Sequence, residues 1–88
     1  MTSKTVEVTN AIGLHARPAS MLINTAKKYS SVFTLSKGAA STDLRSMISL
    51  LKLQVKMGDS VTVAADGPDE EQAVEGLVAL IESKFGEE

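Results

Sequence analysis

The sequence of 88 residues contains no cysteine, no tryptophan, a single histidine and no long apolar run. Without cysteine there are no disulfides, thiolate nucleophiles or cysteine-bound metals. One histidine also excludes a metal site built from several imidazoles. No apolar run approaches the roughly eighteen residues of a membrane span, and no signal peptide is evident. We therefore expect a cytoplasmic protein without membrane insertion, metal or cofactor, and with few side chains suited to catalysis.

The composition is that of a globular protein. Hydrophobic residues make up 43% of the chain and charged residues 23%, unlike the composition of disordered segments. The sequence shows no internal repeat, low-complexity segment or linker. We expect residues 1–88 to form one domain, with a stability of roughly 4–13 kcal/mol at this length.

The charges are distributed unevenly, although the net charge is only −2. Residues 1–56 hold eight Lys and Arg against two acids, a net +6, and residues 57–88 hold one lysine against nine acids, a net −8. A basic and an acidic face on one small domain favour steering toward an acidic protein partner. No nucleic-acid partner is expected, because the chain is acidic overall and only 3% aromatic.

Hydrophobic periodicity predicts the order β-α-β-β-α-β-α. Alternation predicts strands over 4–9, 31–37, 40–43 and 60–65, and helical spacing predicts helices over 16–28, 46–53 and from 69 onward. At the third helix, Asp69 and Gln72 resemble a capping box. The side chains expected to face the core are Val6, Val8, Ala19, Leu22, Ile23, Ala26, Phe33, Leu35, Leu50, Leu53, Val61, Val63, Ala73, Val74, Leu77, Leu80, Ile81 and Phe85. This pattern predicts an α+β fold, with helices on one side of a sheet and water on the other.

His15 is the only side chain that titrates near neutrality and can act as a nucleophile. A lone histidine is usually a polar surface residue, but His15 directly precedes a predicted helix that has Pro18 in its first turn. The free N–H groups of that turn and the helix dipole favour an anion there. Arg17 can bind phosphate oxygens through two hydrogen bonds. These features suit a phosphoryl group that is held on the imidazole and passed to a second protein.

The segment GLHARPAS, residues 13–20, closely resembles the active-site segment of the HPr family, the histidine phosphocarriers of the bacterial phosphoenolpyruvate-dependent phosphotransferase system. The resemblance covers the whole chain without a gap. It implies an open-faced β-sandwich, in which three helices cover one face of a four-stranded antiparallel sheet. It also implies that His15 accepts phosphate on Nδ1 from enzyme I and donates it to enzyme IIA domains for sugar uptake. Arg17 would then contact the phosphate.

Ser46 matches the regulatory serine of the family, which an HPr kinase/phosphorylase modifies in many Gram-positive relatives. The alternative is an ordinary serine N-cap, and the sequence leaves both interpretations open. Regulated members continue with a Met-Gly-Val-Met-Ser-Leu-Gly-like run, whereas this chain has no glycine from Met47 to Gln54. That departure is similar to the nitrogen-branch paralogue. The alternative functions are therefore a nitrogen-branch carrier and a docking regulator that acts through the Ser46 helix.

Two further sets of residues are candidates for partner docking. Met47, Ile48 and Leu51 either belong to the core or form an exposed apolar patch, and the resemblance favours docking for the first two. Lys27 and Arg45 either form a basic rim around that patch or are simply solvated. A carrier that presents one face to successive partners is expected to be a monomer, and to need those partners as the enzymes.

Overall fold

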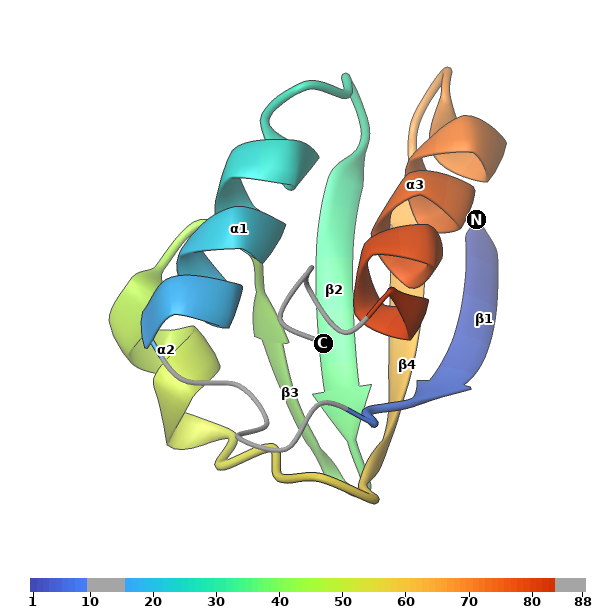
Figure 1. Ribbon diagram of the computed structural model, residues 1–88. Helices are drawn as coiled ribbons and strands as arrows, with labels where there is room; N and C mark the ends of the chain where they lie inside the picture. Colours follow the sequence, from blue (N-terminus) through green and yellow to red (C-terminus); the bar gives the residue numbers. More distant parts are fainter. Residues whose placement is uncertain (10–15, 84–88) are drawn as a thin grey trace.

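The computed structural model describes residues 1–9 and 16–83, which form a four-stranded antiparallel sheet with three helices over one face (Figure 1). The strand order is β1-β4-β2-β3. The predicted α+β class and the order of the elements are confirmed. The elements are β1 (Thr2–Glu7), α1 (Ala16–Ala26), β2 (Val32–Lys37), β3 (Ala40–Asp43), α2 (Met47–Lys52), β4 (Ser60–Asp66) and α3 (Glu70–Glu82).

One face of the sheet is apolar because apolar and polar side chains alternate along its strands. Val61 and Val63 of β4 and Leu35 of β2 are buried under the helices. On the opposite face, the hydroxyl oxygens of Thr5 and Thr62 lie 2.9 Å apart in a cross-strand hydrogen bond. The predicted division between a core face and a solvent face is therefore confirmed.

The helices α1 and α3 complete the core. The buried side chains of α1 are Pro18, Ala19, Leu22, Ile23 and Ala26, and those of α3 are Ala73, Val74, Leu77, Val78 and Ile81. The sequence prediction missed Val78, which lies one turn after Val74 on the same face. It also gave Leu80 a core position, whereas Leu80 is only partly buried against the core. The predicted core residue Phe85 lies outside the described residues.

The bounds of β1 differ from the prediction of a strand over 4–9 by two residues at each end. Strand β1 pairs with β4 from Thr2, opposite Ala65, to Glu7, opposite Ser60. Val8 lies beyond the strand yet is fully buried, and its N–H donates to the carbonyl of Asp59 at 2.8 Å. The alternating pattern therefore continues past the strand, which is why sequence alone placed the strand end too late.

The predicted capping box at Asp69 is wrong, although Asp69 is the N-cap residue of α3. Its carboxylate accepts hydrogen bonds from the Ser31 hydroxyl at 2.5 Å and from the Ser30 N–H at 2.8 Å, and makes no side-chain bond to its own helix. These bonds, the Ser31 hydroxyl first, lower the pKa of the Asp69 carboxyl. The side chain thus joins the turn before β2 to the turn before α3.

Glu70 joins β1 to the start of α3. Its Oε2 accepts from the Thr2 hydroxyl at 2.6 Å and lies 3.1 Å from the amino nitrogen of Met1, and its Oε1 accepts from the N–H of Gly67 at 3.2 Å. These contacts, led by the Thr2 hydroxyl, lower the pKa of the Glu70 carboxyl from 4.5 to about 2.

We expect the protein to lose stability as the pH falls from about 4.5 to about 2. The pKa of Glu70 is lower in the folded than in the unfolded protein. The stabilisation from its contacts is therefore fully present above the unfolded pKa, and it is lost as the pH falls through the folded pKa. The variant Glu70→Gln should therefore show a smaller fall of the thermal midpoint over this range. Glu71→Gln, at the exposed neighbouring position, is the matched control. A fall as steep in Glu70→Gln as in the wild type would contradict this account.

Helix α2 ends in a left-handed residue, since Gln54 has a φ of 55°. A residue with a Cβ adopts this conformation at a cost of roughly 1–2 kcal/mol. Glycine avoids that cost, and the extra conformational entropy that glycine loses on folding is smaller. We expect Gln54→Gly to raise the free energy of unfolding by about 0.5–1 kcal/mol in urea titrations. Lys52→Gly, inside the same helix, should lower it by a similar amount. A lower stability of Gln54→Gly would show that the left-handed residue is not strained.

Candidate functional site

The segment predicted to handle phosphate begins α1. Arg17 is the second residue of the helix and its side chain is exposed, whereas Pro18 and Ala19 are buried. The first turn is thus held against the core, and it contains no acidic side chain that would compete with an incoming anion. His15 immediately precedes Ala16 in the chain. Like the loop predicted over 10–14, it lies outside the described residues.

The structure confirms Ser46 as the N-cap of α2. Its φ and ψ of −120° and 120° are extended, and its Oγ accepts a hydrogen bond from the N–H of Ser49 at 3.3 Å. The Ser46 carbonyl accepts from the N–H of Leu50 at 3.1 Å. A phosphate on this Oγ would meet the positive end of a short helix, and its charge would also reach any partner docked there. Phosphorylation of Ser46 stays a prediction.

Of the three apolar docking candidates on α2, only Ile48 is well exposed, with 68% of its surface accessible. Met47 and Leu51 are partly buried and pack against the core. The reason is the helical period: Leu50 points to the core, and Ile48 lies about 200° away from it around the helix. Met47 and Leu51 flank the buried direction. The expected exposed trio is therefore reduced to Ile48 with two partly covered neighbours.

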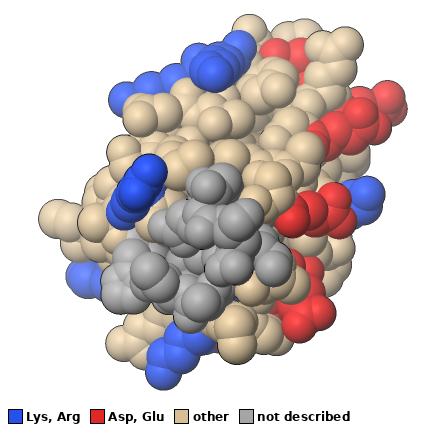
Figure 2. Space-filling view, viewed as in Figure 1, with Lys and Arg blue, Asp and Glu red and all other residues tan. Residues whose placement is uncertain are grey.

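Basic and acidic side chains gather on different sides of the molecule (Figure 2). On the face shown, most Lys and Arg lie on the side of α1 and α2, and most Asp and Glu lie on the side of α3. Within residues 1–9 and 16–83, no ion pair involves Arg17, Lys27 or Arg45. These three cations can therefore meet an acidic partner without first breaking a salt bridge within this part of the chain.

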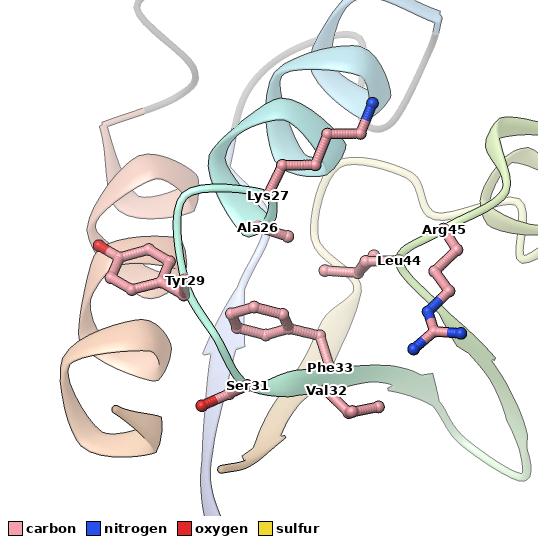
Figure 3. Close-up of a pocket in the computed structure, with 8 residues that line it drawn as sticks. All are labelled: Ala26, Lys27, Tyr29, Ser31, Val32, Phe33, Leu44 and Arg45. Atoms are coloured by element: carbon pink, nitrogen blue, oxygen red, sulfur yellow. The ribbon is translucent and has the colours of Figure 1, made fainter. Parts of the chain in front are cut away.

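The two predicted rim residues line a common hollow of about 170 Å³ between the end of α1 and the start of β2 (Figure 3). Arg45 points its guanidinium toward Val32 and Phe33, whereas the ammonium of Lys27 points away from them. Lys27 follows Arg17 by ten residues, which corresponds to about 15 Å along a helix. The hollow thus lies at the other end of α1 from Arg17.

Val32 is a lining residue that the sequence analysis did not identify. It is 54% exposed, and it lies on the solvent face of β2 with Thr34 and Ser36. The available signal was an apolar residue at an outward position of a strand whose other outward positions are polar. Alternation alone does not show that a hollow adjoins it.

Within residues 1–9 and 16–83, no group of three or more His, Cys, Asp or Glu side chains could hold a metal ion. In the same residues, no helix is both long and apolar enough to cross a membrane. The described residues of the candidate site are therefore the exposed Arg17 at the start of α1, the cations Lys27 and Arg45, and the exposed Ile48 of α2.

Comparisons with known proteins agree on one family. A family model described as "PTS HPr component phosphorylation site" matches residues 2–83. The chain is 46% identical to "Phosphocarrier protein HPr" of Haemophilus influenzae over 81 residues, which cover 92% of this chain and 95% of the relative. It is similar to a crystal structure of HPr-C-His from Thermoanaerobacter tengcongensis, with a TM-score of 0.95, 44% identity, and coverage of 100% of this chain and 99% of that one.

An HPr dimer from Thermoanaerobacter tengcongensis is also similar in structure, with a TM-score of 0.78 at 44% identity. The match covers 99% of this chain and 100% of that chain. The family match includes the segment 13–20 and Ser46. The similarity therefore extends over every residue proposed above for phosphate handling or docking.

Proposed function

Because the chain belongs to the HPr family of phosphocarriers, we propose that His15 carries a phosphoryl group between enzyme I and enzyme IIA domains of the sugar phosphotransferase system. The supporting observation is Arg17, an exposed cation on the anchored first turn of α1, two residues after His15. Phosphate is bound well by such a combination of guanidinium and helix N-terminus.

The transfer needs little covalent chemistry from the chain itself. Nδ1 of the neutral imidazole supplies the lone pair for a new N–P bond, while the bond between phosphorus and the donor breaks. Arg17 then meets the charge of the bound phosphoryl group. In the second step the acceptor attacks phosphorus, and the electron pair of the N–P bond returns to Nδ1. Enzyme I and IIA supply the remaining catalytic groups, so the chain is a carrier and not a complete enzyme.

We further propose that the chain acts in the cytoplasm as a monomer of one domain. A monomer leaves the start of α1 accessible to donor and acceptor in turn. Since a solved HPr dimer is similar to this chain, sedimentation at the concentration used for transfer assays is the appropriate check. A dimer that transfers phosphate without dissociating would contradict the proposal that the chain acts as a monomer.

Phosphate uptake tests the proposed function. The chain is incubated with phosphoenolpyruvate, Mg²⁺ and enzyme I, and its intact mass is then measured before and after mild acid. We expect one added phosphate that acid removes, because phosphoramidates hydrolyse in acid, and none on His15→Ala. Ser46→Ala is the matched control and should take up phosphate like the wild type. Acid-labile phosphate on His15→Ala would overturn the assignment to His15.

A regulatory role of Ser46 is the second candidate, and its N-cap geometry favours it because the hydroxyl lies at a helix start. Incubation with ATP and an HPr kinase should add one acid-stable phosphate, absent from Ser46→Ala. No uptake would leave Ser46 as an N-cap only. The nitrogen-branch alternative is tested separately, by offering the His15-phosphorylated chain sugar-specific and nitrogen-related IIA acceptors.

A further inference from the structure

The ammonium of Lys37, the last residue of β2, makes three contacts with the segment that joins α2 to β4. Its Nζ lies 3.0 Å from Oδ2 of Asp59, and it donates to the carbonyl of Gln54 at 2.8 Å and to that of Leu53 at 3.5 Å. An ammonium has three protons, so these acceptors use all of them. One partly buried cation thus binds both ends of the segment 53–59.

The same segment continues the pairing of β1 with β4 by one residue. The Gly58 N–H donates to the carbonyl of Val8 at 2.7 Å, and the Val8 N–H donates to the carbonyl of Asp59 at 2.8 Å. Oδ2 of Asp59 also accepts from the Lys56 N–H at 2.8 Å. The hydrogen bonds from Lys56 and then from Lys37 lower the pKa of the Asp59 carboxyl. Contacts therefore run without a break from the Lys37 ammonium through Asp59 to Val8.

Val8 is one of two anchors on either side of His15 in the chain. The Val8 side chain is fully buried, and both its backbone groups are bound to residues 58 and 59. On the other side of His15, the buried Pro18 and Ala19 hold the first turn of α1 against the core. The chain between these two anchors carries the imidazole, so a displacement of Val8 is a displacement of one end of that chain.

We propose that Lys37 is a positioning residue for phosphoryl transfer, because its ammonium, acting through Asp59 and Val8, sets the placement of His15. The inference rests on the proposed function, since it gives Lys37 a part in that same transfer. Correct placement of a reacting group lowers the barrier to reaction without strengthening the binding of a partner. Loss of the Lys37 contacts should therefore lower the maximal rate and leave the half-saturating concentration of the chain unchanged.

The test variants change the ammonium or its charged partner. Lys37→Met keeps most of the aliphatic stem and loses all three contacts, whereas Lys37→Arg keeps the positive charge and hydrogen-bond donors. Asp59→Asn keeps an acceptor for the backbone N–H of residue 56 and loses the ion pair. Two controls are matched to the two ways in which Lys37→Met differs from the wild type. Lys4→Met removes an exposed cation from β1, and Ser31→Ala removes a tertiary hydrogen bond far from Val8 in the sequence.

Two measurements separate positioning from partner binding and from stability. Each chain is titrated as a substrate of enzyme I at a temperature well below its thermal midpoint, so that all variants are folded. The half-saturating concentration then reports binding, and the maximal rate reports the transfer itself. Hydrogen exchange of the Val8 amide, followed by NMR, reports whether the hydrogen bond from Val8 to Asp59 has loosened.

We expect Lys37→Met to lower the maximal rate roughly fivefold and to leave the half-saturating concentration unchanged. The loss is smaller than the roughly 100-fold that a displacement of 1 Å can cause, because α1 remains anchored. The Val8 amide should exchange faster in Lys37→Met than in Ser31→Ala. Asp59→Asn should show part of the loss of rate, Lys37→Arg should recover most of it, and both controls should transfer phosphate like the wild type.

Three results would overturn the inference while leaving the carrier function intact. The first is an unchanged maximal rate of Lys37→Met, and the second is a raised half-saturating concentration alone, which would make Lys37 a contact of the partner. The third is an equal loss of rate in Ser31→Ala, which would assign the effect to stability. A wild-type chain that takes up no phosphate would instead overturn the proposed function, and with it the transfer in which Lys37 is given a part.

Discussion

Replacing Arg17 with alanine is expected to slow phosphoryl transfer through the chain by roughly 10²–10³-fold, the loss seen when one preorganised donor to a developing charge is removed. Arg17 is exposed, so the substitution removes no core contact and the protein should stay folded. Its guanidinium is the only cationic side chain in the first turn of α1. The maximal rate of transfer from enzyme I in rapid-quench experiments measures the effect.

Two matched variants separate charge from geometry at this position. Arg17→Lys keeps a positive charge but loses the planar fork that binds two phosphate oxygens, and should recover only part of the rate. Lys28→Ala removes an exposed cation just beyond the far end of the same helix and should leave the maximal rate unchanged. An Arg17→Ala rate close to that of the wild type would remove Arg17 from the mechanism.

Replacing Gly67 with alanine is expected to destabilise the protein by about 2–4 kcal/mol, a large part of its expected stability. A Cβ at Gly67 would lie 2.7 Å from the Cα of Ser31, so a backbone segment must move. The same movement would strain the hydrogen bonds that Ser30 and Ser31 donate to Asp69. Urea unfolding followed by circular dichroism measures the loss.

Substitutions at Ser31 separate the part of the Gly67→Ala penalty that comes from the Ser31 side chain from the part that comes from the backbone. Ser31→Ala removes the hydroxyl that donates to Asp69 and should cost about 1 kcal/mol by itself. Because the closest approach includes the Ser31 Cα, Ser31→Gly should relieve only part of the Gly67→Ala penalty. Complete rescue by Ser31→Gly would place the conflict in the side chain alone, contrary to the geometry.

Local periodicity was sufficient to predict the order of the elements and most of the core. A strand repeats its face every second residue and a helix about every 3.6 residues, so Val61 and Val63 or Leu22 and Ile23 reveal the buried face without knowledge of the neighbours. The Ser46 N-cap is equally local, because the bond to the N–H of Ser49 is made within one turn.

Contacts between distant parts of the chain could not be predicted in this way. The Asp69 carboxylate binds Ser30 and Ser31, which precede it by 39 and 38 residues, in preference to its own helix. The bounds of β1 depend on its register with β4. Similarly, the hollow beside Val32 exists because β3 ends early relative to β2.

The residues of the candidate site also fall into two groups, those predictable from local sequence and those that required knowledge of the fold. His15 and Arg17 lie in one short segment at a helix start, so sequence alone could bring them together, and the family resemblance gave them roles. The surface around α2 required the fold: only the structure shows that Ile48 is exposed, that Met47 is partly covered, and that Arg45 points toward Val32.

Transfer from the isolated phosphorylated chain tests the central claim most directly. The chain is phosphorylated by enzyme I, separated from enzyme I and phosphoenolpyruvate, and mixed with a IIA acceptor, and the masses of both proteins are followed with time. The account predicts that phosphate leaves the chain as it appears on IIA, in equal amounts, and that His15→Ala never becomes loaded. Phosphate that stays on the chain, or that appears only as inorganic phosphate while IIA stays unmodified, would contradict it.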